Sequence, residues 1–257
     1  MGVSTHRARG WVSTWVAATA AIVSAPTRAQ LSGDFSAQLY RPAPGRGNFV
    51  TVESARLEDD LAPSVGLFFD YAHDPLAIYP VGCPRNPGQN CSYRVVGALV
   101  TANLLGALAF ARRLQIGVAV PLMYEAIGST LPPNLAASPQ PHTPATGFSD
   151  VRFSLKGRLF GSHEGLAVGL SEQVEIPTGQ SMLAGRYLAE SGWVSYTRAI
   201  ADLRVRGLAF GLNVGFVWRA SPAQIYNVAI GPRLTGAFAA SYDLGSSARL
   251  VLEIAMQ

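Results

Sequence analysis

The sequence has little charge. Only 14% of its 257 residues are charged and 49% are hydrophobic, whereas a typical soluble domain has about 25% charged residues. It also lacks a purely apolar run of about 18 or more residues with the flanks of a membrane helix. Low charge without such a run is typical of a membrane β-barrel, in which apolar residues alternate with small and polar ones.

Cysteine is scarce. The two residues, Cys83 and Cys91, are separated by a segment that contains proline and glycine. In an exported protein such an isolated pair predicts a disulfide that closes a small loop, and two free thiols are the alternative. A metal site needs more ligands than this pair supplies, and none follows at a suitable spacing. We therefore expect no metal site.

Catalytic signatures are also missing. There is no GxSxG, no HExxH and no phosphate-binding glycine loop. Beyond the first 29 residues, the histidines His73, His142 and His163 each stand alone in a predicted loop. The sequence therefore predicts no enzyme and no cofactor. An outer-membrane lipid-modifying enzyme stays as an alternative, because such enzymes bring serine, histidine and aspartate together at a barrel rim.

The N-terminus has the organisation of a secretory signal peptide. A basic start precedes an apolar stretch over 11–23, and Thr-Arg-Ala at 27–29 predicts cleavage after Ala29. The apolar stretch is too short to cross a membrane as a helix. Removing residues 1–29 takes three arginines and no acid from 20 basic and 16 acidic residues, so 17 and 16 remain. This near balance gives no support to nucleic-acid binding.

Alternation with a period of two is the main positive signal, and it is clearest over residues 208–218. Large apolar side chains there alternate with mostly small or polar ones: Leu208, Phe210, Leu212, Val214, Phe216 and Trp218 against Ala209, Gly211, Asn213, Gly215 and Val217. Successive side chains leave a strand on opposite sides, so the segment predicts a two-faced strand. Its length matches the roughly 9–11 residues that a tilted strand needs to cross the hydrocarbon.

The same pattern recurs and predicts nine strands. They cover residues 64–71, 94–105, 113–124, 150–160, 166–176, 193–201, 208–218, 228–242 and 248–256. The predicted connections alternate between long and short, as in outer-membrane barrels with short periplasmic turns and long extracellular loops. A membrane helix over 95–111 is the alternative for one segment, but it leaves the other strands unexplained. Four aromatic residues near strand ends are expected in interfacial girdles: Tyr124, Trp193, Trp218 and Tyr242.

Charged side chains of the predicted strands fall opposite the large apolar ones. Because a basic side chain facing lipid at mid-depth costs about 2–4 kcal/mol, we expect them in the barrel interior. The predicted lumen-facing charges are Asp70, Arg113, Asp150, Arg152, Lys156, Arg158, Glu175, Arg233, Arg249 and Glu253. Small barrels are about wide enough for side chains to fill, so these charges should pair and plug the lumen. An open pore would instead have a mild anion preference. Glu172 falls on the apolar face and has no explanation in the pattern.

Several short segments together resemble a known family. They are residues 35–42 (FSAQLYRP), 47–52 (GNFVTV), 61–66 (LAPSVG), 150–156 (DVRFSLK) and 176–179 (IPTG). They resemble the N-terminal barrel region of outer-membrane protein A family proteins of myxobacterial type, and the last two also look like those of other outer-membrane channel and transporter-like barrels. The resemblance implies a barrel in the outer membrane. Fuller members continue into a periplasmic peptidoglycan-binding domain, for which this sequence has no counterpart.

We therefore expect an all-β fold, an antiparallel up-and-down transmembrane β-barrel of about 8–12 strands. The barrel should cover 64–257, after the signal peptide over 1–29 and a periplasmic N-terminal arm over 30–63. Because single-chain bacterial barrels have even strand numbers, we expect a tenth strand in addition to the nine. Our preferred source is a continuation beyond residue 257. The alternatives are a weak strand at 35–40 that inserts as an edge, or two strands read as one.

The expected function follows from this architecture. We expect a structural protein or a narrow porin-like channel of the cell outer membrane, without catalysis. Its partner should be outer-membrane lipid, with a small solute if the pore is open. A secreted or periplasmic lipocalin-like barrel, whose cavity takes a small apolar ligand, is the alternative.

Overall fold

The computed structural model describes residues 35–78, 93–127, 144–161, 164–183, 186–225, 228–245 and 248–256. The chain divides into two compact units, Met1–Gln30 and Leu31–Gln257, and all described residues belong to the second. The predicted signal peptide, the predicted disulfide between Cys83 and Cys91, and the histidines His142 and His163 lie outside the described residues.

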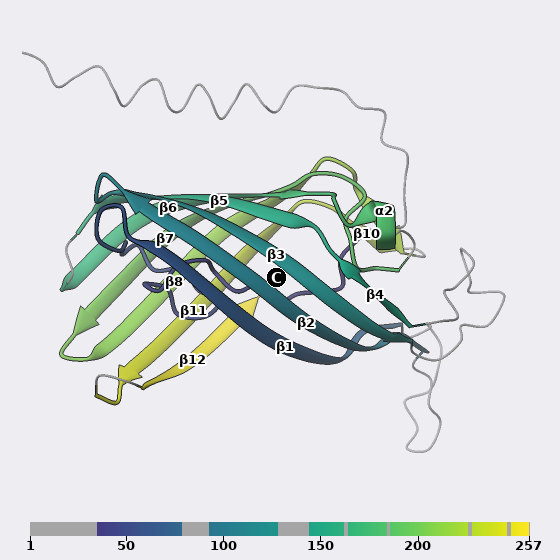
Figure 1. Cartoon of the computed structure of the whole chain (residues 1–257), viewed down its shortest axis with the longest axis horizontal. Helices are drawn as coiled ribbons and strands as arrows, with labels where there is room; N and C mark the ends of the chain where they lie inside the picture. Colours follow the sequence, from purple (N-terminus) through teal and green to yellow (C-terminus); the bar gives the residue numbers. More distant parts are fainter. Residues whose placement is uncertain are drawn as a thin grey trace, which may run out of the picture. The chain divides into compact units, whose positions relative to one another are not determined.

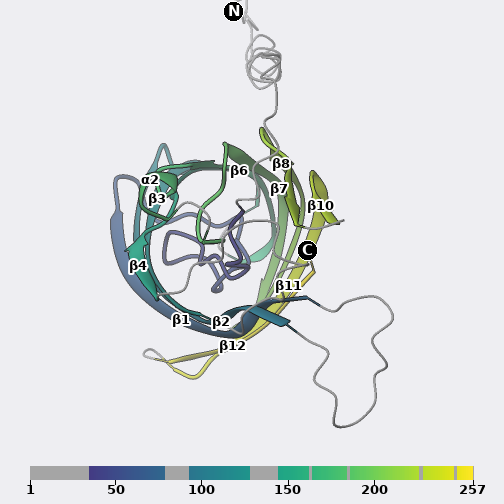
Figure 2. The same ribbon diagram turned by 90° about the vertical axis from the view of Figure 1, so that its right-hand side faces the viewer.

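Antiparallel strands form one sheet that curls around a central space, the lumen (Figures 1 and 2). In the described part of the chain, nine of its strands neighbour one another in chain order. They are β1 (Pro63–Ile78), β2 (Tyr93–Phe110), β3 (Leu114–Ile127), β5 (Val151–Phe160), β6 (Gly165–Ile176), β7 (Val194–Val205), β8 (Leu208–Arg219), β11 (Arg233–Asp243) and β12 (Arg249–Met256). The short β4 (Ala145–Phe148) pairs with β3 beside this path. The fold is all-β, antiparallel and up-and-down, as the sequence predicts.

Each of the nine predicted strands is confirmed, with shifted ends. All but the last residue of the segment that could have been a helix, 95–111, lie in β2, and none of the described helices is long and apolar enough to cross a membrane. The largest difference falls in 228–242, where β10 (Val228–Ile230) forms a separate hairpin with β9 (Ala223–Ile225). Pro232 follows this hairpin, and a proline cannot donate to a strand ladder. The connection between β6 and β7 contains the short helix α2 (Gln180–Leu183).

The connections define two ends of the sheet. Short turns follow β2, β5, β7 and β11, and longer connections follow β1, β3, β6 and β8; these are termed the turn end and the loop end. At the turn end, Arg206 and Gly207 join β7 to β8 with φ angles of 49° and 84°. Two residues at positive φ are the arrangement of a type I′ turn, whose twist matches that of the flanking strands.

The outer surface of the sheet is apolar. Along β8 the large side chains predicted to face outward are exposed, and every intervening residue is buried. On β1 the outward side chains Val65 and Phe69 are 77% and 65% exposed. The four aromatic residues expected in girdles are also exposed: Tyr124, Trp193, Trp218 and Tyr242. Water-soluble monomers rarely expose an apolar surface of this extent, whereas a membrane barrel requires one.

Residues 35–58, termed the luminal segment, lie inside the curled sheet (Figure 2) and run from its loop end to its turn end (Figure 1). The Ala37 N–H donates to the Tyr187 carbonyl (2.7 Å) in a loop-end connection, and the Leu61 N–H donates to the Ala109 carbonyl (2.8 Å) near the turn end. Residues 35–58 of the predicted N-terminal arm over 30–63 therefore lie inside the curled sheet. Residues 35–40 form no strand, so they do not supply the extra edge considered for them.

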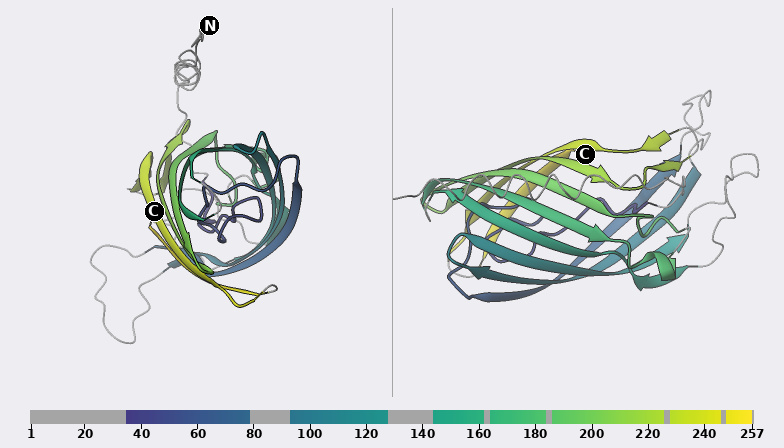
Figure 3. Two further views of the ribbon diagram at one scale, coloured as in Figure 1. Left: turned by 90° about the vertical axis from the view of Figure 1, so that its left-hand side faces the viewer. Right: turned by 90° about the horizontal axis from the view of Figure 1, so that it is seen from above.

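The two ends of the strand order, β1 and β12, have no second neighbour among the described strands. Within the described residues β1 pairs only with β2, and β12 pairs only with β11. Figures 2 and 3 show these edges facing each other where the sheet curls round, and the space between them is termed the seam. β12 is short, since it pairs only with the part of β11 from Gly236 to Asp243.

Candidate functional site

The lumen is the candidate functional site, and small residues make room in it for the luminal segment. A Cβ atom added at Gly211 of β8 would lie less than 3.0 Å from the ring of Phe49, and one added at Gly117 of β3 would lie as close to Pro44. The small face predicted for 208–218 is therefore the face on which the luminal segment packs. Close backbone approach is a usual reason for glycine inside a strand.

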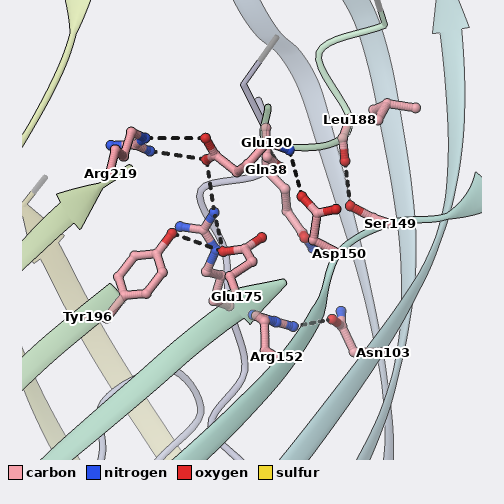
Figure 4. A network of polar contacts seen from close by, with 12 residues as sticks. Gln38, Asn103, Ser149, Asp150, Arg152, Glu175, Leu188, Glu190, Tyr196 and Arg219 are labelled. Atoms are coloured by element: carbon pink, nitrogen blue, oxygen red, sulfur yellow. Dashed lines mark hydrogen bonds and ion pairs between the residues drawn. The ribbon is translucent and has the colours of Figure 1, made fainter. Parts of the chain in front are cut away.

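A cluster of charges at the loop end, the mouth cluster, joins the luminal segment to three parts of the sheet (Figure 4). Arg41 pairs with Glu175 of β6 (3.3 Å), which also accepts a hydrogen bond from the Tyr196 hydroxyl (3.0 Å). Glu190, from the connection between β6 and β7, receives two hydrogen bonds from Arg219 of β8 (3.1 and 3.2 Å). All five side chains are buried, so each charge depends on its partners.

Asp150 attaches the connection between β6 and β7 to the start of β5. Its carboxylate accepts hydrogen bonds from the backbone N–H groups of Gly179 (2.9 Å) and Glu190 (2.5 Å). Burial raises the pKa of Asp150 to about 7, although these two backbone donors act in the opposite direction. Next to it, the Ser149 hydroxyl donates to the Leu188 carbonyl. The two neighbouring side chains thus fix the connection across the loop end.

A second group of contacts fastens the middle of the luminal segment. The Glu53 carboxylate pairs with Arg198 of β7 (2.7 Å) and accepts from Ser171 of β6 (3.0 Å). The Asn213 side chain of β8 accepts from the Glu53 N–H (2.7 Å) and donates to the Glu53 carbonyl (2.8 Å). Glu53 is thus bound through both its side chain and its backbone.

Asp202 of β7 holds the next three residues of the luminal segment. It accepts hydrogen bonds from the Ser54 hydroxyl and the Ala55 N–H, each at 2.7 Å, and its other oxygen lies 3.0 Å from Nε of Arg56. Arg56 also donates to the Gly165 carbonyl at the turn end (2.6 Å). The carboxylate of Asp202 is almost completely buried.

Besides Glu175, three of the predicted lumen charges contact the luminal segment directly: Asp70, Lys156 and Glu253. The Glu253 carboxylate of β12 accepts from the backbone of residues 50–52 and from the Thr51 hydroxyl (2.6 Å). The Lys156 ammonium of β5 donates to the Asn48 side chain (2.7 Å). Asp70 accepts hydrogen bonds from the side chains of Gln38 (3.4 Å) and Asn103 (3.1 Å), and Asn103 in turn accepts from Arg152 (2.7 Å).

The predicted set of ten charges is therefore placed as follows. Six face the lumen and hold other groups there: Asp70, Asp150, Arg152, Lys156, Glu175 and Glu253. Arg233 is half-buried on β11. Three lie at the turn end instead: Arg113 is in the exposed turn after β2, Arg158 donates to the carbonyl of Arg112, and Arg249 pairs with Asp243. Glu175 and Arg249 form ion pairs with residues outside the predicted ten, Arg41 and Asp243.

The sequence reasoning missed the partners of these charges. They are Arg41, Asn48, Glu53, Arg56, Glu190, Arg198, Asp202, Asn213 and Arg219. A signal existed on β7, because the period-two register that buries Val194 and Tyr196 continues through Arg198 and Asp202 once the strand is extended to Val205. The luminal segment itself shows no such register.

The outward Glu172 gains an explanation. Its two carboxylate oxygens accept hydrogen bonds from the Ser195 and Thr197 hydroxyls of the adjacent strand β7. The three side chains form a small polar site on an otherwise apolar surface. Hydrogen bonds of this kind lower the cost of a polar group in an apolar environment.

A cavity of about 220 Å³ lies between the luminal segment and the sheet beside β12. Its wall includes Arg41 and Arg198, which both lie over the Tyr196 ring at 4.8 and 5.4 Å. Both guanidinium groups are paired with carboxylates. In the described wall of the cavity these cations are thus neutralised, which gives little basis for recognition of an anionic ligand.

Metal-binding side chains are not clustered among the described residues. They contain no group of three or more histidine, cysteine, aspartate or glutamate side chains that could hold a metal ion. The one described histidine, His73, is exposed near the loop end of β1, 3.3 Å from Asp74. Comparison of the chain with protein-family models, with curated proteins and with solved structures gives no match.

Proposed function

We propose that this protein is a structural β-barrel of the bacterial outer membrane whose lumen is closed by its own N-terminal segment, without a catalytic step. The observation that carries the proposal is the luminal segment, which is tied to β3, β5, β6, β7, β8 and β12 by hydrogen bonds or ion pairs. The apolar outer surface supports outer-membrane lipid as its partner.

The contacts favour a closed barrel over an open pore. A solute path through the lumen would require the luminal segment to leave, which separates Arg41 from Glu175, and Glu53 from Arg198. Breaking a buried pair by removing one partner costs about 3–5 kcal/mol. A narrow porin-like channel for a small solute therefore requires a second conformation of the luminal segment.

The distribution of polarity disfavours a lipocalin-like barrel. A barrel that carries an apolar ligand needs an apolar, vacant interior and a polar exterior. Here the largest apolar side chains of β8 point outward, and the interior contains buried charges such as Lys156 and Asp202. The interior is also occupied by the chain itself.

The resemblance to outer-membrane protein A family barrels supports the same proposal. Its most charged motif, 150–156, supplies Asp150, Arg152 and Lys156. All three are buried and hydrogen-bonded in the lumen. The residues behind the resemblance therefore contribute to closing the barrel.

Membrane fractionation and electrophoresis test the proposal. The mature protein should be found in the outer-membrane fraction, require detergent for extraction, and change its electrophoretic mobility on heating. Purified protein should also leave phospholipid and lipopolysaccharide unhydrolysed. A monomer that stays in solution without detergent, or acyl release above that of a matched blank, would contradict the proposal.

A further inference from the structure

Glu172 places an acidic side chain on the apolar outer surface of the sheet. In the strand register it lies opposite Leu155 of β5 and Thr197 of β7. Its outward neighbours along β6 are Leu170 and Val174. Ionisable side chains at membrane depth are costly and usually have a partner, so an outward carboxylate points to a contact with a functional role.

The described partners of Glu172 leave its charge uncompensated. They are the hydroxyl groups of Ser195 and Thr197, each of which donates to one carboxylate oxygen, the second at 2.6 Å. Hydroxyl groups donate hydrogen bonds but carry no charge. An ionised carboxylate has about four acceptor sites, and these bonds use only two of them. The site therefore suits a group that is cationic and has N–H donors, because charge-assisted hydrogen bonds are the strong ones.

Two tryptophans place this site just below the membrane interface. Ser195 lies opposite Trp218 of β8 in the strand register, and Trp193 comes immediately before β7. Trp193 and Trp218 are 51% and 37% exposed, and tryptophan rings favour the depth of the lipid headgroups. Thr197 is also exposed. The carboxylate is therefore accessible from the lipid side, within reach of a headgroup.

We propose that Glu172, Ser195 and Thr197 bind the headgroup of a lipid that carries a primary ammonium group. The carboxylate accepts N–H donors from the ammonium, and the two hydroxyls orient the carboxylate toward it. A lipid is the occupant that this depth favours, because headgroups surround a barrel at the level of its tryptophans. The proposal rests on the membrane barrel proposed above and states which class of lipid it prefers as a partner.

Quenching of tryptophan fluorescence tests this inference. Of the four tryptophans, the two beyond residue 29 are Trp193 and Trp218, so the mature protein reports on this site alone. It is reconstituted into phosphatidylcholine vesicles that contain an equal fraction of either phosphatidylethanolamine or phosphatidylcholine with brominated acyl chains. Bromine quenches the tryptophans that it contacts. Both headgroups carry a positive nitrogen, but only phosphatidylethanolamine has N–H donors.

We expect phosphatidylethanolamine to be enriched at the tryptophans about fivefold over phosphatidylcholine, the upper end for an exposed ion pair. Glu172→Gln keeps the size of the side chain but removes its charge, and should abolish the preference. Asp60→Asn is the matched control, because it removes the same charge from an exposed position before β1, and should retain the preference.

Equal quenching by the two brominated lipids in the wild type would overturn the inference, and so would an unchanged preference in Glu172→Gln. The change of electrophoretic mobility on heating is measured on the same samples and scored separately. Failure of the lipid site is therefore distinguishable from failure of the proposed membrane barrel.

Discussion

Single residues in this lumen are matched to the luminal segment rather than to one another. Lys156 finds its acceptor on Asn48, and Asp202 finds its donors on Ser54 and Ala55. On β8 the lumen-facing position next to the Phe49 ring is a glycine, Gly211, which leaves space for that ring. The predictions at this scale therefore concern how firmly the luminal segment is held.

Replacing Gly211→Ala should loosen the luminal segment. The added methyl group overlaps the Phe49 ring, and overpacking of this kind costs about 1–3 kcal/mol. Urea unfolding in detergent, followed by tryptophan fluorescence, measures the loss. Gly66→Ala is the matched control, because a Cβ at that position meets nothing closer than 3.9 Å. Equal stability of the two variants would show that the Phe49 contact is absent.

The mouth cluster gives a second prediction. Arg219→Met leaves the buried Glu190 carboxylate with only Arg41 at 3.9 Å among its described ion pairs, so we expect a loss of about 3–5 kcal/mol. The double variant Arg219→Met with Glu190→Gln removes the uncompensated charge and should recover part of that loss. Unfolding free energies of the wild type, both single variants and the double variant complete the cycle. Strictly additive losses would exclude the coupling.

Asp150 makes stability depend on pH. Burial raises its pKa from 3.8 to about 7, so the folded protein binds this proton more tightly than the unfolded chain. Stability from this group is therefore greatest below about pH 4 and falls as pH rises toward 7, by at most about 1.4 kcal/mol per unit. Asp150→Asn should flatten that slope in urea unfolding curves measured from pH 4 to 8. If the unfolding free energy of the two proteins changed equally with pH, a group other than Asp150 would be responsible for the pH dependence.

Strands have an outer face suited to lipid. Leu212→Arg, in the middle of β8, should cost about 2–4 kcal/mol in a bilayer. Leu244→Arg places the same charge in the turn after β11, where Leu244 is already 60% exposed, and should change stability by less than about 0.5 kcal/mol. Folding yield into lipid vesicles measures both. A soluble barrel would tolerate both arginines equally well.

The strands could be predicted from the sequence because their period is local. The alternation within residues 208–218 alone is enough to assign side chains to the two faces of the strand. The position of the luminal segment could not be predicted in this way. Pro42 and Pro44 interrupt any periodic pattern in it, and its contacts are distant in sequence, since Ser54 and Asp202 are 148 residues apart. The charges on 150–156 were correctly assigned to the lumen, but their partners depend on which segment fills it.

The whole unit from residue 31 to 257 combines an apolar exterior with an interior that its own chain occupies. Nine strands in chain order leave the edges of β1 and β12 unpaired within the described residues. The luminal segment supplies the buried charges of the sheet with partners along the length of the lumen, as Glu175 and Asp202 show. Occupation of the lumen by the luminal segment and the unpaired edges of the described sheet are thus separate features of the molecule.

Conductance across a planar lipid bilayer tests closure of the lumen most directly. The measurement compares the mature protein with a variant that lacks residues 35–58, each reconstituted at the same protein-to-lipid ratio. Our account predicts no defined conductance steps for the intact protein and reproducible steps for the deletion variant, because only the variant has a vacant lumen. Steps of the same size from both proteins would contradict it.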